Sequence, residues 1–328
     1  MTLIFIVVLL ALVFDFSNGF HDTANAIATS VSTKALPPRT AVIYAAVLNF
    51  AGALVFTGVA KSIGGKIADP AHIPNGILIV IAALLAAIAW NLITWYFGIP
   101  SSSSHALIGA LTGAVVTGAG LHGVNWTGFS TILEALILSP ILAFVTGYII
   151  MTILKLLVRN ASPHWTNKWF RVFQIISAGM QAFSHGSNDA QKSMGIMVFA
   201  LVAGGFQTEL DVPLWVKISA ALAMGLGTSV GGWRIIKTIG SKIIKLEPVN
   251  GFAADLTSSL VIQAATALTL PVSTTHVVSS SVMGTGAAKR FRAVKWGVAG
   301  RIVLAWIITI PITAVLAGGC YLVLNLFM

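Results

Sequence analysis

Two aspartates with closely similar surroundings are the residues of this chain best suited to bind a cation. Asp22 closes residues 16–22 and Asp189 closes residues 183–189; both segments open with Phe-Ser, carry a glycine and lie in strongly apolar sequence. Ionisable side chains in a membrane-like setting are costly and usually mark a functional site. The repetition of this motif, about half a chain length apart, therefore predicts a pair of related sites.

Each aspartate has a different polar residue three positions later. Asn25 follows Asp22, and on a helix the two share one face, where their oxygens and carbonyl groups freed by a helix break would suit a small hard cation. The alternative is a helix cap made by Asn18 or Asp22. Lys192 follows Asp189, so these two can form an ion pair. Three roles of Lys192 are then open: its charge replaces a bound cation, it binds an anionic substrate, or it forms a purely structural ion pair with Asp189.

A second pattern, Pro-x-Ser-(Ser/Thr)-(Ser/Thr)-His, also occurs twice, at residues 100–105 and 271–276. Apolar runs stop at both copies, so we expect helices to be interrupted there. Hydroxyl groups beside the open N–H groups of a helix N-terminus bind anions, and two facing clusters would surround a tetrahedral oxyanion. The alternative is that the hydroxyls merely satisfy the backbone at a bend. The candidate anion ligands are Ser102, Ser103, Ser104, Ser273, Thr274 and Thr275.

The same residues do not have the pattern of a metal site or of a catalytic site. The four histidines of the motifs lack metal-ligand spacing such as H-E-x-x-H, and the chain has a single cysteine, so we expect no resident metal. Residues 227–231 match G-x-S-x-G, but that motif has meaning at a strand–turn–helix elbow, and no strand is expected around it. The sequence therefore does not predict an enzyme.

The composition is that of a protein dissolved in lipid. The chain is 57% hydrophobic and 9% charged, against about 25% charged residues in soluble domains. Several apolar runs, such as residues 77–97 and 302–326, reach the ~20 residues that a membrane-spanning helix needs. The net charge of +10 does not indicate nucleic-acid binding, because the basic residues lie in short loops between apolar runs.

The two duplicated motifs occur in the same order and at nearly the same separation, which predicts an internal duplication. We expect a first repeat at residues 1–154, a short basic connector at 155–168 and a second repeat at 169–328. Placing the basic loops in the cytoplasm puts both termini outside and gives the repeats opposite orientations. The predicted fold is an all-α polytopic membrane protein of two inverted-topology repeats. It would have about 10–12 membrane segments, with discontinuous helices (including one at residues 15–19) or re-entrant hairpins.

The motifs resemble those of the PiT inorganic phosphate transporters. Residues 19–26 are similar to the family's G-x-N-D-x-A-N-A motif, and residues 186–192 are similar to its partner in the second half. Both Pro-x-Ser turns and residues 251–255 resemble the family as well. His21 departs from the usual Asn of the motif. Gln191-Lys192 resembles the bacterial low-affinity branch, which is associated with proton coupling and metal–phosphate cargo.

The resemblance implies a symporter in the cell membrane that imports inorganic phosphate, free or as a metal–phosphate complex, with H⁺ or Na⁺ as the coupling ion and no other cofactor. Its partners would be phosphate and the lipid bilayer; a homodimer is compatible with the sequence. Alternatives are a permease for sulfate or another oxyanion on the same scaffold and a divalent-metal carrier. Lys192 would join the six hydroxyl residues at phosphate, and Asp22, Asn25 and Asp189 would hold the cation. Supporting residues would be Asn18, His21, His105, His185, Asn188, Asp255 and His276.

Overall fold

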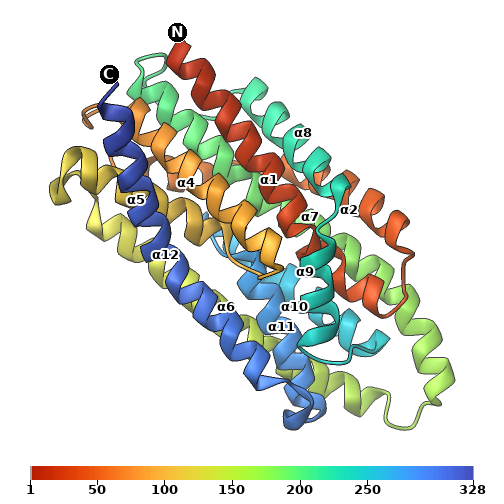
Figure 1. The fold of residues 1–328 in the computed structure, drawn as a ribbon. Helices are drawn as coiled ribbons and strands as arrows, with labels where there is room; N and C mark the ends of the chain where they lie inside the picture. Colours follow the sequence, from red (N-terminus) through yellow and green to blue (C-terminus); the bar gives the residue numbers. More distant parts are fainter. Residues whose placement is uncertain (1, 328) are drawn as a thin grey trace.

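The apolar runs form helices that lie mostly along one direction, with both termini at the same end of the molecule (Figure 1). The computed structural model describes residues 2–327, in which there are twelve α-helices and no strand. The first six are α1 (Thr2–Ser32), α2 (Pro38–Ala53), α3 (Gly58–Lys66), α4 (Gly76–Phe97), α5 (Ser103–Ala119) and α6 (Trp126–Leu157). The others are α7 (Pro163–Ala203), α8 (Leu214–Val230), α9 (Trp233–Lys237), α10 (Pro248–Ala267), α11 (Thr274–Lys289) and α12 (Trp296–Asn325).

The order of long and short helices in the first half recurs in the second half, and the equivalent long helices α1 and α7 are antiparallel. Gly204, just beyond the end of α7, lies against Ile4 near the start of α1. At the other end of α1, Thr33 donates a hydrogen bond of 2.6 Å to Gln174 in the first part of α7. The link between α6 and α7 lies at the end of the molecule opposite to the termini (Figure 1). These directions agree with an inverted duplication.

Four helices, α1, α4, α6 and α12, are long and apolar enough to cross a membrane. Two bent helix pairs also qualify when each is taken together: α2 with α3, bent by 70°, and α8 with residues 233–242, bent by 61°. The first bend falls at residues 54–57, inside a mostly apolar stretch that runs from residue 40 to residue 60. The bend is stabilised from the other half of the chain, because Gln191 accepts hydrogen bonds from the N–H groups of Val59 (2.8 Å) and Ala60 (3.2 Å) at the start of α3.

The predicted break at residues 15–19 is absent, since α1 continues through it, and α7 likewise runs unbroken through the second motif. The helix accommodates small polar residues there because their hydroxyls donate to carbonyl oxygens of the preceding turn and so need no partner that would open the backbone. Ser17 donates to Phe14 (2.7 Å), and Ser187 donates to Ser184 (2.9 Å). The polar character of these segments therefore serves side-chain contacts, and it does not open the backbone.

The other two predicted interruptions are present, and they meet inside the molecule. The chain leaves α4 at Gly98, whose positive φ of 65° favours glycine, and enters α5 after Ser102; α11 begins after Ser273 in the same way. The Ser104 hydroxyl donates to the Val272 carbonyl oxygen at 2.8 Å, which joins one turn to the other. Both helix N-termini are thereby brought to one place.

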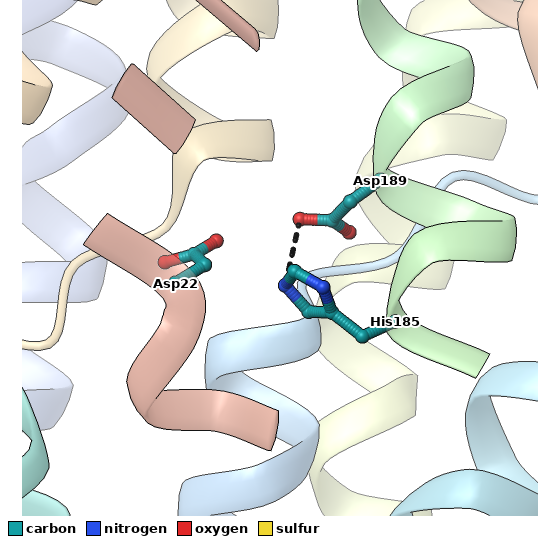
Figure 2. Close-up of side chains that lie close together, drawn as sticks. All are labelled: Asp22, His185 and Asp189. Atoms are coloured by element: carbon teal, nitrogen blue, oxygen red, sulfur yellow. Dashed lines mark ion pairs between the residues drawn. The ribbon is translucent and has the colours of Figure 1, made fainter. Parts of the chain in front are cut away.

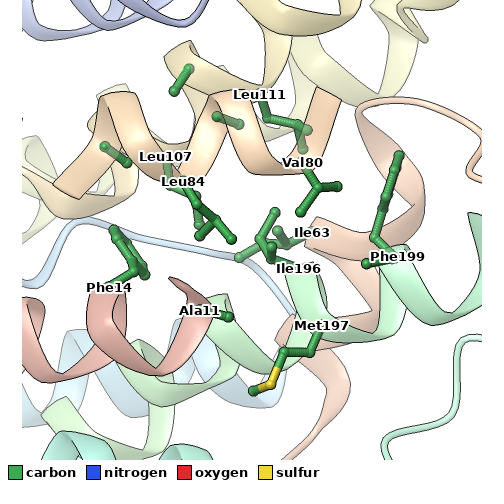
Figure 3. Packing of buried hydrophobic residues seen from close by; sticks show 14 of the residues in the cluster. Ala11, Phe14, Ile63, Val80, Leu84, Leu107, Leu111, Ile196, Met197 and Phe199 are labelled. Carbon is green, nitrogen blue, oxygen red and sulfur yellow. The ribbon is translucent and has the colours of Figure 1, made fainter. Parts of the chain in front are cut away.

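A buried apolar cluster holds α1, α4, α5 and α7 together beside the motifs (Figure 3). Phe14 of α1, Leu84 of α4, Leu107 of α5 and Ile196 of α7 are all fully buried in it. Because lipid is as apolar as these side chains, close fit is what favours their packing. Phe14 lies about two helical turns before Asp22, so this packing positions the first motif.

Close backbone contacts at glycines connect the two halves. Gly19 of α1 packs against Gly227 of α8, and Gly186 of α7 packs against the backbone of Asn49 in α2. Gly113 of α5 meets Ala314 of α12 and Gly284 of α11 meets Phe144 of α6 in the same manner. Each contact pairs a helix of one half with a helix of the other, at distances that leave no room for a Cβ atom.

We expect Gly227→Ala to lower the midpoint of thermal unfolding, because its Cβ would overlap the Phe16 carbonyl oxygen and overpacking typically costs about 1–3 kcal/mol. Gly297→Ala is the matched control: it also lies in a helix, and apart from its chain neighbours and the backbone of its own helix no heavy atom of residues 2–327 would be within 4 Å of its Cβ. Unfolding is followed by tryptophan fluorescence in detergent. Equal midpoints for the two variants would contradict the packing role of Gly227.

Candidate functional site

The aspartates of the two motifs face one another across the interface of α1 and α7. Figure 2 shows Asp22 on α1 and, on α7, Asp189 with His185 one turn before it. Ligand atoms of these three residues lie within 4.8 Å of one another, and all three side chains are buried. The structure therefore brings the two carboxylates of the repeated motifs together in one place.

Asp22 is contacted by both Ser/Thr turns. Its Oδ2 accepts from Ser103 at the start of α5 (3.3 Å), and its Oδ1 accepts from Thr275 at the start of α11 (3.3 Å). His21 Nδ1 lies 2.6 Å from Oδ1 of the same carboxylate, while the other ring nitrogen of His21 lies 3.1 Å from the Thr94 hydroxyl. One carboxylate thus connects the first motif to both helix N-termini.

Asp189 has the equivalent position in the second motif but a different set of partners. Its Oδ1 forms an ion pair of 2.8 Å with Nζ of Lys192. Its Oδ2 accepts from Thr274 (3.2 Å) and Asn18 (3.3 Å) and lies 3.5 Å from His185 Nε2. Hydrogen bonds to charged groups are stronger than neutral ones, so this carboxylate is firmly held.

Lys192 is completely buried and links the second motif to the first turn. Besides its ion pair with Asp189, its ammonium group donates to the Ser103 hydroxyl at 3.2 Å. Removing one member of a buried pair leaves an uncompensated charge and is strongly destabilising. With neutral histidines, Asp22, Asp189 and Lys192 together carry one net negative charge, which an added cation would balance.

Asn25 lies on the same face of α1 as Asp22 and has an acceptor free. Its Nδ2 donates to Thr275 (2.9 Å) and Thr274 (3.5 Å), whereas its Oδ1 is buried with no hydrogen-bond partner among the described residues. Buried polar atoms are nearly always paired, so this amide oxygen is an acceptor that remains available to a ligand. Carboxylate, amide and hydroxyl oxygens are a donor set for a small hard cation.

The six candidate hydroxyls divide into two groups. Ser103, Thr274 and Thr275 donate to the motif aspartates. Ser102 and Ser273 instead accept from the backbone N–H of the histidine three residues later, at 3.1 and 3.2 Å, and so cap α5 and α11, while Ser104 joins the two turns. The first group is within the site, and the second holds the turns in shape.

The remaining predicted residues lie around this centre. His105 and His276 have ring centroids 4.3 Å apart, and His276 stacks on Trp306; both histidines line a cavity of about 610 Å³ on the α6 and α12 side of the turns. Asn188 donates to Thr266 at 2.9 Å, next to the second turn. Asp255 accepts from Thr29 at 2.6 Å, about two turns further along α1 than Asp22.

Thr94 is a polar residue of the site that was not predicted from the sequence, and Asn49 is one that lies outside the repeated motifs. Thr94 contacts His21, and Asn49 lies 3.1 Å from His185 while donating to Thr228 at 2.9 Å. Both sit inside apolar runs, and an isolated polar residue in such a run is the signal that could have identified them. Their function follows only from the neighbouring helices that they contact.

Comparison with known proteins agrees with this arrangement. The model of the Phosphate transporter family matches residues 18–317. The "probable low-affinity inorganic phosphate transporter" of Bacillus subtilis (strain 168) is 58% identical over 322 residues, covering 98% of this chain and 97% of that protein. The protein of the same description from Rhizobium meliloti (strain 1021) is 46% identical over 318 residues, covering 96% and 95%. A solved structure described as "the sodium-dependent phosphate transporter" is similar with a TM-score of 0.89 and 25% identity, over 100% of both chains.

The matched region contains both aspartate motifs and both Ser/Thr turns, and the similarity in structure extends over the whole fold. The expected all-α membrane fold and the PiT resemblance are confirmed, and the family is one of transporters and not of enzymes. This chain belongs to the phosphate transporter family.

Proposed function

We propose that the protein imports inorganic phosphate together with a coupling cation. The observation that carries this proposal is the convergence of two helix N-termini, their hydroxyls and a buried lysine on a pair of buried carboxylates. Donors for an oxyanion and acceptors for a cation thus lie side by side. The relatives in Bacillus subtilis and Rhizobium meliloti, both described as probable phosphate transporters, support phosphate as the anion.

Phosphate would be held by Ser103, Thr274, Thr275 and Lys192, with the capped helix N-termini adding to the favourable field. In the closed site these hydroxyls donate to Asp22 and Asp189, so they are not free for an anion. A cation bound to the carboxylates would compete for the same oxygens and release the hydroxyls toward phosphate. Binding of cation and anion then favour each other, which is the coupling that symport requires.

The coupling cation would be bound by Asp22 and Asn25, with Asp189 as the related carboxylate. In the second motif, Nζ of Lys192 lies 2.8 Å from the Asp189 carboxylate and supplies a positive charge there. The equivalent position of the first motif is occupied by the neutral Asn25. One exchangeable ion, H⁺ or Na⁺, is therefore the expected number at this duplicated motif. The basic loops and the position of the termini support a cytoplasmic connector with both termini outside.

The test is uptake of labelled phosphate into proteoliposomes, with a proton gradient and a sodium gradient imposed separately. Phosphate should accumulate under one of these gradients, and excess sulfate should compete weakly. Equal competition by sulfate would favour a general oxyanion permease. Because Asp22, His185 and Asp189 could also ligate a metal, transport of a divalent metal in the absence of phosphate would instead identify a metal carrier.

Asp22→Asn should abolish phosphate uptake while leaving the protein folded. The amide keeps the shape of the side chain but loses the charge that balances a cation, and it cannot accept all the hydrogen bonds from His21, Ser103 and Thr275. Uptake in proteoliposomes is the measurement, and the thermal unfolding midpoint in detergent is the control for folding. Wild-type uptake in this variant would refute the assignment of the cation site.

Lys192→Asn should make phosphate uptake newly dependent on sodium. The substitution removes the built-in positive charge at Asp189 and gives the second motif the Asp and Asn pair of the first. The initial uptake rate is measured over a range of sodium concentrations at constant ionic strength, with potassium as the matched salt. An ion response unchanged from the wild type would show that Lys192 does not stand in for a cation.

A further inference from the structure

Asp15 is a buried carboxylate that the transport scheme above does not use. It lies on α1 seven residues before Asp22, and the series Asp15, Asn18, Asp22 and Asn25 keeps the spacing of three and four that defines one face of a helix. That face lies against α7, since Asn18 donates to Asp189. Asp15 is therefore the first polar residue of the stripe to which the candidate cation ligands belong.

Asp15 has no exposed surface, and neither carboxylate oxygen has a hydrogen-bond partner among residues 2–327. Ser193 faces it from α7 but donates to the Ala190 carbonyl oxygen at 2.9 Å. Native proteins rarely leave a buried polar side chain unpaired, and an ionised one is the costliest case. The surroundings of Asp15 therefore fit a neutral, protonated carboxyl group in this closed conformation.

The charged groups whose electrostatic field acts on Asp15 are Asp189 and Lys192, both from α7. Lys192 is already paired with Asp189. Of the other helices beside this part of α1, α4 contains no charged residue and α8 carries only Lys217, in its first turn. Asp255 of α10 contacts Thr29, near the opposite end of α1, and the basic Arg234 of α9 contacts the Tyr96 carbonyl oxygen at the end of α4. Lys192 is thus the cation available to Asp15 once it loses a proton.

We propose that Asp15 carries the proton that is transported with phosphate. In the closed state the proton stays on the Asp15 carboxyl group, and Lys192 pairs with Asp189. When the site opens toward the cytoplasm, the O–H bond breaks, the proton passes to water, and the carboxylate that remains shares the ammonium group of Lys192 with Asp189. Opening toward the outside lets water return a proton to Asp15 and restores the first state.

This assignment rests on the proposed phosphate transport and applies to H⁺ as the coupling ion, which Asp15 would then carry in place of Asp22 and Asn25. With Asp15 ionised, three carboxylates (Asp15, Asp22 and Asp189) surround one lysine, and the field repels an oxyanion. Protonation of Asp15 removes one of these negative charges, so phosphate binds better to the protonated protein. By linkage, bound phosphate favours retention of the proton to the same degree.

The test compares two assays on Asp15→Asn, whose amide resembles the protonated carboxyl group. The first is exchange of labelled for unlabelled phosphate across proteoliposomes at equal concentrations and pH. The second is phosphate accumulation driven by a pH gradient without sodium, with a luminal pH dye recording proton entry. We expect exchange to persist and accumulation and proton entry to be lost. The half-saturating concentration of the transported phosphate species, corrected for the ionisation of phosphate itself, should become independent of pH. Asp69→Asn, in an exposed loop, is the matched control and should behave as the wild type.

Proton-driven accumulation that persists in Asp15→Asn would overturn the proposal, as would wild-type accumulation driven by sodium alone. Absence of phosphate exchange in the wild type would instead refute the proposed function itself. If Asp15→Asn loses exchange as well, Asp15→Glu tests whether a carboxyl group at this position is what transport needs, because this variant keeps one. Recovery of both activities with a shifted pH profile supports the proposal, and failure of Asp15→Glu to recover them in a folded protein refutes it.

Discussion

The ion pair between Asp189 and Lys192 determines the electrostatic state of the whole site. Both side chains are completely buried, so neither could remain charged there without the other. Lys192 also reaches Ser103 in the other half of the chain, and through Ser103 it is connected to Asp22. A change in the charge at one motif is therefore felt at the other, both through the Ser103 hydroxyl group and through the hydrogen bond from Asn18 to Asp189.

This pair also makes a duplicated site functionally asymmetric. An exact duplication would give two equal cation sites, each with an aspartate and a neutral amide. Here one site has a permanent ammonium group, and the other has Asn25 with an unpaired oxygen. The two halves keep the same arrangement of helices. Asn25 and Lys192, each three residues after its aspartate, make the two halves of the site chemically different.

Much of this architecture could be predicted from the sequence, because its signals are local. Membrane helices follow from apolar runs, and the interruptions near Gly98 and Pro271 follow from residues that end helices. The meeting of Asp22 with Asp189 was predictable because inverted repeats place matching motifs together. Which hydroxyls contact the aspartates and which cap the helices could not be predicted, since Ser102 and Ser103 differ only in their position relative to the start of α5. The bend after α2 and the continuity of α1 were also missed. The bend depends on Gln191 from the other half, and the continuity depends on hydroxyls that bond within the helix.

The glycine contacts between the halves limit how the molecule can move. Gly19 with Gly227, Gly113 with Ala314 and Gly284 with Phe144 each bring the backbones of two helices from different halves into direct contact. Surfaces fitted so closely resist sliding, because any shift would separate the backbones or make them collide. A rotation of residues 2–157 as one body against residues 163–327 would have to break every one of these contacts. These close-packed contacts therefore join helices of both halves into shared units, and their boundaries do not follow the midpoint of the chain.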